Sequence, residues 1–484
     1  MRVLHICTEI YPILKTGGLA DVAGSLPPAL AALNVDVRML MPGFPALVEA
    51  LAQRRIVATL PGRFGAQAIV LALGVLPNGI WVYVIEAPQL YDRPGNPYAD
   101  SAGVPYADNY RRFALLGWVG AQLALGLDAS WTAQICHAHD WHAGLCAPYL
   151  KAAQRATDKR SAGTVLTIHN LAFQGMFAPE IMSELDLPED FYQMHGLEFY
   201  GHVSFLKAGL FYSDKLTTVS PTYAQEIQQS AQGCGLEGLL TGRATDLTGI
   251  LNGVDTAVWN PATDIHIPAR YARSALEGKQ HCRAALQKEV GLKPQDQAPL
   301  FGVVSRLTDQ KGLHLILAGL PDLLERGAQL VVLGAGELEL EASFQKFSAT
   351  YPGSVAIDIG YDEYKAHRII AGCDVMLVPS RYEPCGLTQL YALAYGALPL
   401  VRRVGGLADS VVDCTPENLA RDTATGFVFD DFSAPAFIAA VQRACDLFPK
   451  KNIWLALRQC AMRQSFSWHA SALQLLPIYK QLIF

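Results

Sequence analysis

Residues 3–21 read VLHICTEIYPILKTGGLAD, and this stretch decides the fold. It begins with a short apolar run, Val3–Cys7, of the kind that forms a buried strand. A glycine pair, Gly17 and Gly18, then precedes a helical pattern over Ala20–Leu33. A strand, a glycine loop and a helix in this order open a β-α-β unit, and such units build a parallel sheet.

The same alternation continues along the chain and then starts again. The first series of apolar runs predicts strands at Val35–Leu40, Ile80–Ile85, Ile135–Ala138 and Val165–Ile168. The second series predicts strands at Leu300–Val304, Leu330–Leu333, Val355–Ile359, Val375–Val378 and Leu398–Val401. Segments long enough for helices lie between them, such as Leu313–Arg326 and Leu387–Tyr395. Two separate series predict two doubly wound α/β domains.

The domain boundary is expected where Gly, Thr and Asp become frequent, near Gly235–Thr256. We therefore predict a first domain over residues 1–245 and a second over 246–461. A C-terminal helix over residues 462–484 is expected to return to the first domain. Within the boundary region, residues 251–255 are interpreted as a strand that runs into an Asn-Gly turn.

Three prolines lie in segments with helical patterns. Pro477 is expected to kink the C-terminal helix, because proline lacks a backbone N–H and clashes with the preceding turn. Pro27 and Pro28 are expected to mark the start or a bend of the helix that follows the glycine loop.

Composition and charge exclude several classes of protein. The 484 residues are 51% hydrophobic and 17% charged, with a net charge of −6, so neither nucleic acid nor an anionic membrane surface is an expected partner. The longest uncharged apolar stretch, residues 113–127, is too short to span a membrane and is expected to form a buried helix. The ten cysteines form no Cys-x-x-Cys pair, and the N-terminus lacks the pattern of a signal peptide. These features predict a cytoplasmic protein.

Two loops that follow predicted strands carry lysine or arginine beside a helix start. In the first half, Lys15 stands two residues before Gly17 and Gly18, so cationic charge and helix N–H groups are available to an anion. In the second half, Arg306 and Lys311 flank the entry to the next predicted helix. Each loop has a plainer reading, a glycine turn beside a surface lysine or a pair of solvated cations. Together they favour a site that neutralises a diphosphate.

A carboxylate follows the predicted strand at residues 375–378. Pro384 disfavours helix at Glu383, and Gly386 precedes a helical run. This arrangement would aim the backbone N–H groups of Leu387 and Thr388 at a phosphate while Glu383 projects at the same edge. A carboxylate beside an anion site is costly unless it meets hydroxyl groups or a developing cation, and a sugar offers both. The alternative is an ordinary helix cap.

Histidines and an aspartate follow two strands of the first half. The stretch HAHDWH, residues 137–142, suggests a metal site, but strand positions i and i+2 share a face that the third histidine leaves, so no metal is predicted. Asp140 is better interpreted as a carboxylate that binds hydroxyl groups. His169 ends another strand and is expected at the same edge, with a core histidine as the alternative. No Asp-x-Asp occurs, so cations and helix N-termini would have to stabilise a leaving group, and no cofactor is predicted.

In order along essentially the whole chain, these motifs resemble the glycogen and starch synthase family, in its bacterial ADP-glucose-dependent form. The resemblance is carried by Lys15-Thr-Gly-Gly-Leu-Ala-Asp21, His137-Ala-His-Asp-Trp-His-Ala-Gly144, Thr167-Ile-His-Asn170, Leu251-Asn-Gly-Val-Asp255, Ser305-Arg306, Gln310-Lys-Gly312, Ile359-Gly-Tyr361 and Glu383-Pro-Cys-Gly-Leu-Thr388. It implies a GT-B fold, in which two Rossmann-like domains face each other across a deep cleft. It also implies retaining transfer of glucose from ADP-glucose to the 4-hydroxyl at the non-reducing end of an α-1,4-glucan such as glycogen.

The resemblance also implies roles for individual residues. The diphosphate would be bound by Lys15, Arg306 and Lys311 and by the N–H groups of Leu387 and Thr388. Tyr361 would stack on the adenine. The glucose hydroxyls would be held by His169, Asn252 and Glu383, with Asp140 near the reacting centre and Glu9 on the acceptor side. The remaining motif residues expected to line the substrate site are Gly18, Asp21, Cys385 and Gly386.

Two alternatives stay open on the sequence. One is a GT-B transferase that uses a UDP-sugar and a small acceptor, and the other is a non-catalytic protein that binds glucan. A nicotinamide-dependent enzyme is disfavoured, because the Gly-x-Gly at residues 334–336 lacks the third glycine of a dinucleotide-binding loop.

Overall fold

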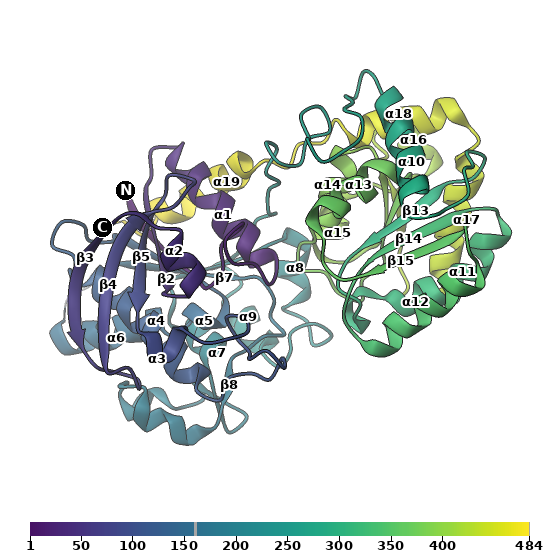
Figure 1. Cartoon of the computed structure of the whole chain (residues 1–484). Helices are drawn as coiled ribbons and strands as arrows, with labels where there is room; N and C mark the ends of the chain where they lie inside the picture. The colour runs from purple at the N-terminus through teal and green to yellow at the C-terminus, as the bar shows by residue number, and fades with distance from the viewer. Residues whose placement is uncertain (159–161, 484) are drawn as a thin grey trace. The chain divides into compact units, whose positions relative to one another are not determined.

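Two large sheets and a small three-stranded one organise the computed structural model, which describes residues 1–158 and 162–483 (Figure 1). The chain divides into a first unit, residues 1–253 with 468–484, and a second unit, residues 254–467. Residues 159–161 and 484 fall within the predicted first domain and its C-terminal helix, but they lie outside the described residues. Each unit has its own hydrophobic core around its own sheet.

Helices separate the parallel strands of the first unit, as the sequence pattern predicted. Its strands are β1 (Arg2–Ile6), β2 (Asp36–Pro42), β3 (Ala52–Pro61), β4 (Ala68–Val75), β5 (Trp81–Glu86), β6 (Ile135–His139), β7 (Gly163–Ile168), β8 (Met176–Phe177), β9 (Glu198–Phe199), β10 (His202–Ser204), β11 (Lys215–Thr218) and β12 (Leu247–Gly249). Its helices are α1 (Gly18–Ala31), α2 (Pro45–Glu49), α3 (Pro88–Tyr91), α4 (Asn109–Ala124), α5 (Asp140–Ala143), α6 (Cys146–Thr157), α7 (Phe205–Tyr212), α8 (Pro221–Glu226), α9 (Glu237–Gly242) and α19 (Trp468–Lys480), with 3₁₀ turns η1 (Pro179–Glu184) and η2 (Glu189–Phe191).

The first sheet has nine strands in the order β12-β11-β7-β6-β1-β2-β5-β4-β3. Its central strands are parallel, and in chain order β11 to β5 read 6-5-4-1-2-3, the doubly wound Rossmann order. The edge strand β3 and its neighbour β4 pair antiparallel, and the sequence analysis did not predict them. The order reverses between β1 and β6, which is the point where open α/β sheets bind ligands.

The second unit repeats the pattern with a smaller sheet. Its strands are β13 (Leu300–Val304), β14 (Gln329–Gly334), β15 (Val355–Ile359), β16 (Val375–Val378), β17 (Leu398–Arg402) and β18 (Phe427–Phe429). Its helices are α10 (Glu277–Glu289), α11 (Leu313–Glu325), α12 (Leu338–Thr350), α13 (Glu363–Gly372), α14 (Thr388–Ala394), α15 (Gly405–Ser410), α16 (Pro416–Ala420), α17 (Ala434–Leu447) and α18 (Lys451–Ala461), with the 3₁₀ turn η3 (Asp309–Lys311).

All strands of the second sheet are parallel, in the order β15-β14-β13-β16-β17-β18. This is 3-2-1-4-5-6 in chain order, so the reversal lies between β13 and β16. Helices α11, α12 and α17 cover one face and α10, α13 and α14 the other (Figure 1). Both units therefore have the Rossmann-like architecture that the sequence predicted.

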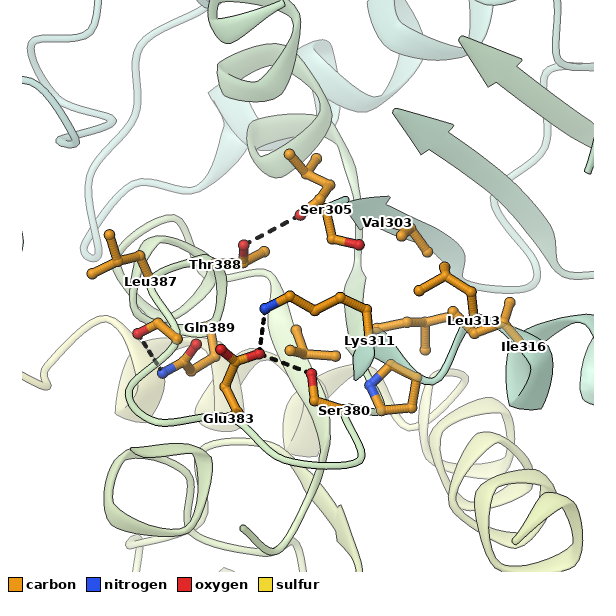
Figure 2. Close-up of a pocket in the computed structure, with 15 residues that line it drawn as sticks. Val303, Ser305, Lys311, Leu313, Ile316, Ser380, Glu383, Leu387, Thr388 and Gln389 are labelled. Atoms are coloured by element: carbon orange, nitrogen blue, oxygen red, sulfur yellow. Dashed lines mark hydrogen bonds and ion pairs between the residues drawn. The ribbon is translucent and has the colours of Figure 1, made fainter. Parts of the chain in front are cut away.

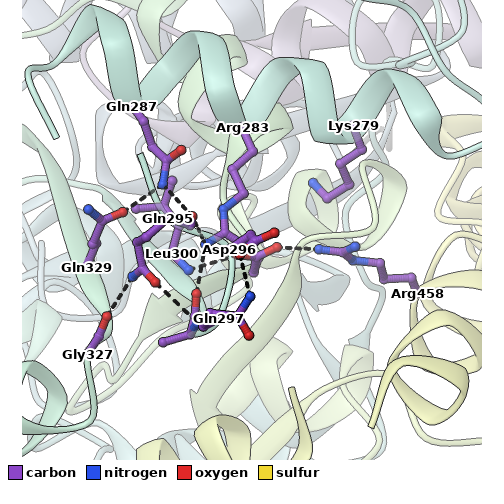
Figure 3. Close-up of polar contacts among 12 residues, drawn as sticks. Lys279, Arg283, Gln287, Gln295, Asp296, Gln297, Leu300, Gly327, Gln329 and Arg458 are labelled. Atoms are coloured by element: carbon purple, nitrogen blue, oxygen red, sulfur yellow. Dashed lines mark hydrogen bonds and ion pairs between the residues drawn. The ribbon is translucent and has the colours of Figure 1, made fainter. Parts of the chain in front are cut away.

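A buried polar network stabilises the second sheet at the edge where β13 and β16 begin. Asp374 accepts a hydrogen bond from the Leu300 N–H at 2.8 Å and pairs with Arg283 of α10 at 2.8 Å and with Arg458 of α18. Figure 3 shows Arg283 and Arg458 converging from these two helices, with Lys279 beside them. Because the network uses the amino ends of the strands, the carboxyl ends are left for a site.

The prolines of the first helix lie inside it and do not mark its start, which was one of the two expected outcomes. Helix α1 runs from Gly18 through Pro27 and Pro28 to Ala31. A residue with an N–H at position 28 would bond the carbonyl of Gly24, and the side-chain amide of Asn78 donates to that oxygen instead, at 3.1 Å. A partner outside the helix thus compensates for one missing bond.

The C-terminal helix is shorter than predicted. It was expected over residues 462–484, but α19 begins only at Trp468, because residues 462–466 form a turn and an irregular segment, and Ser467 forms a bridge with Val254. Pro477 lies inside α19, which is a single helix. The apolar side of α19 packs against α1 through Trp468 and Leu475, within the core of the first unit.

The strand interpretation of residues 251–255 is wrong, because β12 ends at Gly249. Residues 251–253 carry no strand pairing, and Val254 makes only the isolated bridge to Ser467. The apolar residues on either side of this segment belong to different cores. Ile250, which precedes it, packs with α19 in the first unit, and Val254 belongs to the core of the second unit.

The uncharged apolar stretch at residues 113–127 forms most of α4, a buried helix as predicted. Among the described residues, no helix is both long enough and apolar enough to cross a membrane.

Candidate active site

The predicted site residues gather at the carboxyl ends of the strands on either side of each reversal point. In the first unit, Glu9 follows β1 and Asp140 follows β6. In the second unit, Lys311 follows β13 and Glu383 follows β16. Parallel strands bring their carboxyl ends to one edge, so residues far apart in sequence become neighbours there.

Glu9 organises the glycine loop of the first unit. One carboxylate oxygen accepts the N–H groups of Thr16 at 2.6 Å and Gly17 at 2.9 Å, and the other accepts the hydroxyl of Tyr98 at 2.5 Å. Glu9 is buried, so these three bonds compensate for the loss of water around its charge. Glu9 was predicted on the acceptor side, and in this structure it holds the loop in place.

The glycine loop is open toward its outer side. A methyl group added at Gly17 or Gly18 would meet no atom within 4 Å, so a ligand could approach the backbone at the start of α1. Lys15 pairs with Asp21 at 2.9 Å, and both side chains are partly exposed. The motif therefore presents a cation and a helix start together, with Asp21 as the partner of the lysine.

Asp140 and His169 are brought together at the ends of β6 and β7. One oxygen of Asp140 accepts the backbone N–H of His169 at 2.7 Å and that of Asn170 at 3.4 Å. Burial, with a smaller contribution from the negative charge of Glu9, raises the pKa of Asp140 to about 7, although the two N–H groups act in the opposite direction. The backbone of Asp140 has φ of 55°, a left-handed conformation that aspartate tolerates better than most residues.

His169 is a neutral imidazole near pH 7, because burial lowers its pKa to about 3. It lines a cavity of about 30 Å³, together with His139 of β6, Thr217 of β11 and Asn252. The structure thus brings together His169 and Asn252, which the resemblance assigned to the same sugar.

One group of histidines among the described residues has the spacing of a metal site. Ring nitrogens of His5, His137 and His139 lie within 4.8 Å of one another. In the sequence, His137, His139 and His142 are the candidate ligands; His5 is not among them, because β1 contributes it from a distant part of the chain. Both ring nitrogens of these three residues already take part in hydrogen bonds with neighbouring side chains, which a metal ion would have to displace.

In the second unit, Lys311 and Glu383 form a direct ion pair. Lys311 Nζ lies 2.6 Å from Glu383 Oε2, and the hydroxyl of Ser380 donates to the same oxygen at 2.8 Å. Figure 2 shows the two side chains pointing toward each other, with Ser380 beside the carboxylate. Glu383 is buried, so the pair fixes a cation and a carboxylate at the reversal point of the sheet.

The helix start predicted after Glu383 is present. Gly386 has φ of 72°, a left-handed conformation, and Leu387 and Thr388 follow as the cap and first residue of α14. First-turn N–H groups have no partner within their own helix. Gly386, Leu387 and Thr388 line one cavity of about 30 Å³ together with Lys311 and Glu383, as Figure 2 shows for the labelled side chains.

The backbone around Glu383 and Cys385 is held by a glycine pair that the sequence analysis did not single out. A methyl group on Gly405 would lie 1.9 Å from the carbonyl oxygen of Glu383, and one on Gly406 would lie 2.1 Å from that of Cys385. Both glycines begin α15, directly after β17. A Gly-Gly pair behind a predicted strand was the signal that could have identified them.

Arg306 and Tyr361 are more exposed than the other predicted residues of this unit. Among the described residues, the Arg306 guanidinium donates one hydrogen bond, to the side chain of Gln310 at 3.3 Å. The ring of Tyr361 is 74% exposed, and its hydroxyl donates to Glu363 at 2.7 Å. Neither residue lines the cavity beside Lys311, and both remain predicted contacts of a larger ligand.

Tyr98 and Ser380 are site residues that no sequence pattern singled out. Tyr98 is 89 positions from the Glu9 carboxylate that it contacts, and its ring stacks on His142. Ser380 lies directly before the motif that contains Glu383. Their roles depend on tertiary contacts that a single sequence does not show.

The arrangement suits transfer of a group from an activated phosphate. Lys311 and the start of α14 offer positive electrostatic potential to a leaving group, and the neighbouring Glu383 offers negative charge to a developing cation. Asp140 and the neutral His169 of the first unit offer an acceptor carboxyl and a hydrogen-bonding ring.

Comparisons with known proteins agree with this reading. Residues 2–242 match the family model described as starch synthase catalytic domain, and residues 287–454 match that of glycosyl transferases group 1. The chain is 55% identical to the glycogen synthase of Francisella tularensis subsp. novicida, over all of this chain and 99% of the relative. It is also 55% identical to that of Francisella philomiragia, over the full length of both.

Two solved structures resemble the whole chain. The catalytic domain of starch synthase IV from Arabidopsis thaliana, bound to ADP and acarbose, aligns with a TM-score of 0.90 and 30% identity, covering 99% of each chain. A sucrose-phosphate synthase from Thermosynechococcus elongatus aligns with a TM-score of 0.59 and 17% identity, covering 99% of this chain and 98% of that one, and this match shows a shared fold only.

Proposed function

Because the chain belongs to the glycogen and starch synthase family of glycosyltransferases, we propose that it is a hexosyltransferase that elongates α-1,4-glucan. It transfers glucose from ADP-glucose to the 4-hydroxyl at the non-reducing end of the glucan, with retention at the anomeric carbon, and releases ADP. The observation that carries the proposal is the pairing of Lys311 with Glu383 beside the start of α14, at the reversal point of the second sheet.

The second unit supplies the groups that bind the donor. Lys311, Arg306 and the N–H groups that open α14 hold the diphosphate, and Tyr361 stacks on the adenine. Glu383 binds glucose hydroxyls and stabilises positive charge on the sugar as the bond to ADP breaks. Lys311 already contacts Glu383 at 2.6 Å, so a bound phosphate would share the lysine's positive charge with this carboxylate.

The first unit supplies a second set of groups. Lys15 and the glycine loop provide further cationic and N–H contacts for the diphosphate. His169 and Asn252 hold hydroxyl groups of the glucose, and Asp140 fixes the backbone of His169 while its carboxyl stays near the reacting centre. Glu9 keeps the glycine loop in its open shape.

The transfer itself proceeds on one face of the sugar. The bond between the anomeric carbon and the ADP oxygen breaks, and the acceptor hydroxyl oxygen forms the new bond from the same side. The departing phosphate oxygen takes the proton of that hydroxyl, so no protein nucleophile is needed. A glucosyl adduct trapped on Glu383 or Asp140 would refute this mechanism and establish a double displacement instead.

The free state of all ten cysteines supports a reducing compartment, and we place the reaction in the cytoplasm.

Parallel assays with ADP-glucose and UDP-glucose, each with and without glycogen, test the proposed function. Rapid nucleotide release that requires both ADP-glucose and glycogen is the expected result. Nucleotide release that prefers UDP-glucose and does not require glycogen would instead favour a transferase that uses a UDP-sugar and a small acceptor. Glycogen binding without any nucleotide release would favour a non-catalytic glucan-binding protein.

A further inference from the structure

A line of hydrogen-bonded side chains leads from His169 into the interior of the first unit. His169 Nε2 lies 2.9 Å from Nδ1 of His139, and Nε2 of His139 lies 2.9 Å from Nδ1 of His5. His5 Nε2 in turn lies 3.2 Å from the hydroxyl of Tyr479, on the C-terminal helix α19. His5, His139 and Tyr479 are each at most 1% exposed, so water does not interrupt these links.

The line continues beyond the tyrosine. The Tyr479 hydroxyl lies 2.6 Å from Nδ1 of His137, whose Nε2 lies 2.6 Å from the hydroxyl of Thr167. Thr167 then contacts Thr217, its register partner on β11, at 2.6 Å between hydroxyl oxygens. Residues from four strands and one helix thus form one continuous chain that ends at His169.

The histidines of this chain are neutral, which makes the direction of each link matter. Burial lowers the pKa of His5 to about 3 and lowers those of His137 and His139 well below the usual range. A neutral imidazole has one N–H and one acceptor nitrogen. Each ring in the chain therefore donates on one side and accepts on the other, and a hydroxyl between two rings can do the same.

For the three rings His5, His139 and His169, only two arrangements satisfy every link. In one, all donors point toward His169, so its Nε2 accepts and its Nδ1 carries the hydrogen. In the other, all donors point away, so Nε2 carries the hydrogen and Nδ1 is an acceptor. Nδ1 of His169 has no hydrogen-bond partner among the described residues, so this nitrogen is the one that remains to contact a substrate. Whether Nδ1 of His169 donates or accepts a hydrogen bond therefore depends on the direction of the links through His139 and His5.

We propose that Tyr479 is a positioning residue for glucosyl transfer, which fixes the tautomer and orientation of His169 through His5 and His139. The inference rests on the proposed function, in which His169 contacts the sugar. Among the described residues, Tyr479 is the one hydroxyl that joins the two halves of this hydrogen-bonded line, because it contacts both His5 and His137. Helix α19 is anchored without this hydroxyl, since Trp468 and Leu475 bury apolar surface against the first unit.

Tyr479→Phe tests the proposal, because it removes the hydroxyl and keeps the ring. We expect kcat to fall about tenfold, equivalent to about 1.4 kcal/mol of transition-state stabilisation, with KM for ADP-glucose changed less than about twofold. The matched control is Tyr91→Phe, since the Tyr91 hydroxyl is equally buried and donates to the Arg112 carbonyl at 2.7 Å, away from the histidines. It should keep the wild-type kcat.

The second readout is the tautomer of His169, measured from ¹⁵N shifts of histidine side chains in selectively labelled protein. The wild-type enzyme should show one tautomer, and Tyr479→Phe should show the other or a mixture, while Tyr91→Phe matches the wild type. If Tyr479→Phe does not fold, His5→Leu interrupts the same chain one link nearer His169 and should give the same loss of kcat.

The outcomes separate this inference from the proposed function. A wild-type enzyme that makes no glucan would overturn the proposed function. An active wild-type enzyme whose Tyr479→Phe variant keeps kcat, or keeps the tautomer of His169, would overturn the inference alone. A loss of kcat no larger than that of Tyr91→Phe would reduce Tyr479 to a structural residue.

Discussion

Glu383→Gln is the substitution that probes the site most sharply, because it removes one charge and almost no volume. The glutamine amide oxygen can still accept from Lys311 and Ser380, which lie 2.6 Å and 2.8 Å from the present carboxylate oxygen. Glu383 is 5% exposed, so its charge acts in a site with little screening by water. The folded structure should therefore survive, and the change should fall on the chemistry.

Two energetic effects set the expected magnitude. Replacing a charge-assisted hydrogen bond to Lys311 by a neutral one costs roughly 1 kcal/mol. Loss of an electrostatic contact that strengthens in the transition state costs about 3 kcal/mol, by analogy with single oxyanion-hole donors. We therefore expect kcat to fall by a factor on the order of 10² or more. The affinity for ADP should stay the same or increase, because Lys311 no longer shares its charge with a carboxylate.

The assay combines initial rates of glucose incorporation from labelled ADP-glucose with calorimetric titration of ADP. The control is Glu289→Gln, which also removes a carboxylate paired with a cation of the second unit, Arg368 at 2.9 Å, but on exposed helical surface. It should leave both quantities unchanged. A kcat within about threefold of the wild type would exclude Glu383 from the mechanism. A comparable loss of ADP affinity would show that Glu383 acts only by positioning Lys311.

Three further predictions follow from burial and backbone geometry. Because burial raises the pKa of Asp140 to about 7, kcat/KM should rise with pH through this value as the carboxyl ionises. Asp140→Asn should abolish this rise. An Asp140→Asn variant that keeps the same pH dependence would assign the ionisation to another group. The free energy of unfolding should fall as pH drops below about 6.5, because five histidines whose pKa is lowered by burial in the folded protein bind protons only when the chain unfolds. Equal thermal midpoints at pH 7.5 and pH 5.5 would contradict this. Those histidines are His5, His137, His139, His142 and His169. Gly405→Ala should destabilise the second unit by about 2 kcal/mol and lower activity, because the added methyl group would overlap the carbonyl oxygen of Glu383 and because the backbone there has a φ of 42°. The control is Gly238→Ala, whose methyl group meets open space. Equal thermal midpoints for the two variants would refute the prediction.

The sequence was sufficient for the architecture because parallel strands are buried on both faces and appear as continuous apolar runs. Every strand predicted in the two series is present, within about two residues at each end. The outer strand β3 was missed because it is largely exposed and lacks such a run. The strand proposed at residues 251–255 failed because the neighbouring strand β12 ends at Gly249, and Val254 packs into the core of the second unit instead.

The candidate site could be predicted only as far as it lies in local motifs. The lysines, carboxylates and helix start that follow β1, β13 and β16 are visible in the sequence, because each loop carries its own chemistry. What the side chains contact was not visible: Lys15 pairs with Asp21, Glu9 binds the glycine loop, and Tyr479 reaches the histidines from 342 positions away. Such contacts depend on tertiary packing, and their residue types are unremarkable on their own.

The central claim is that this chain moves glucose from ADP-glucose onto the end of a glucan. The most direct test follows glucose-labelled ADP-glucose with purified glycogen, and counts the ADP released against the label that enters the polymer. The account predicts one ADP for each glucose incorporated, with the label removable from the non-reducing ends by an enzyme that cleaves α-1,4 linkages. Release of ADP without incorporation, or no release at all, would contradict it.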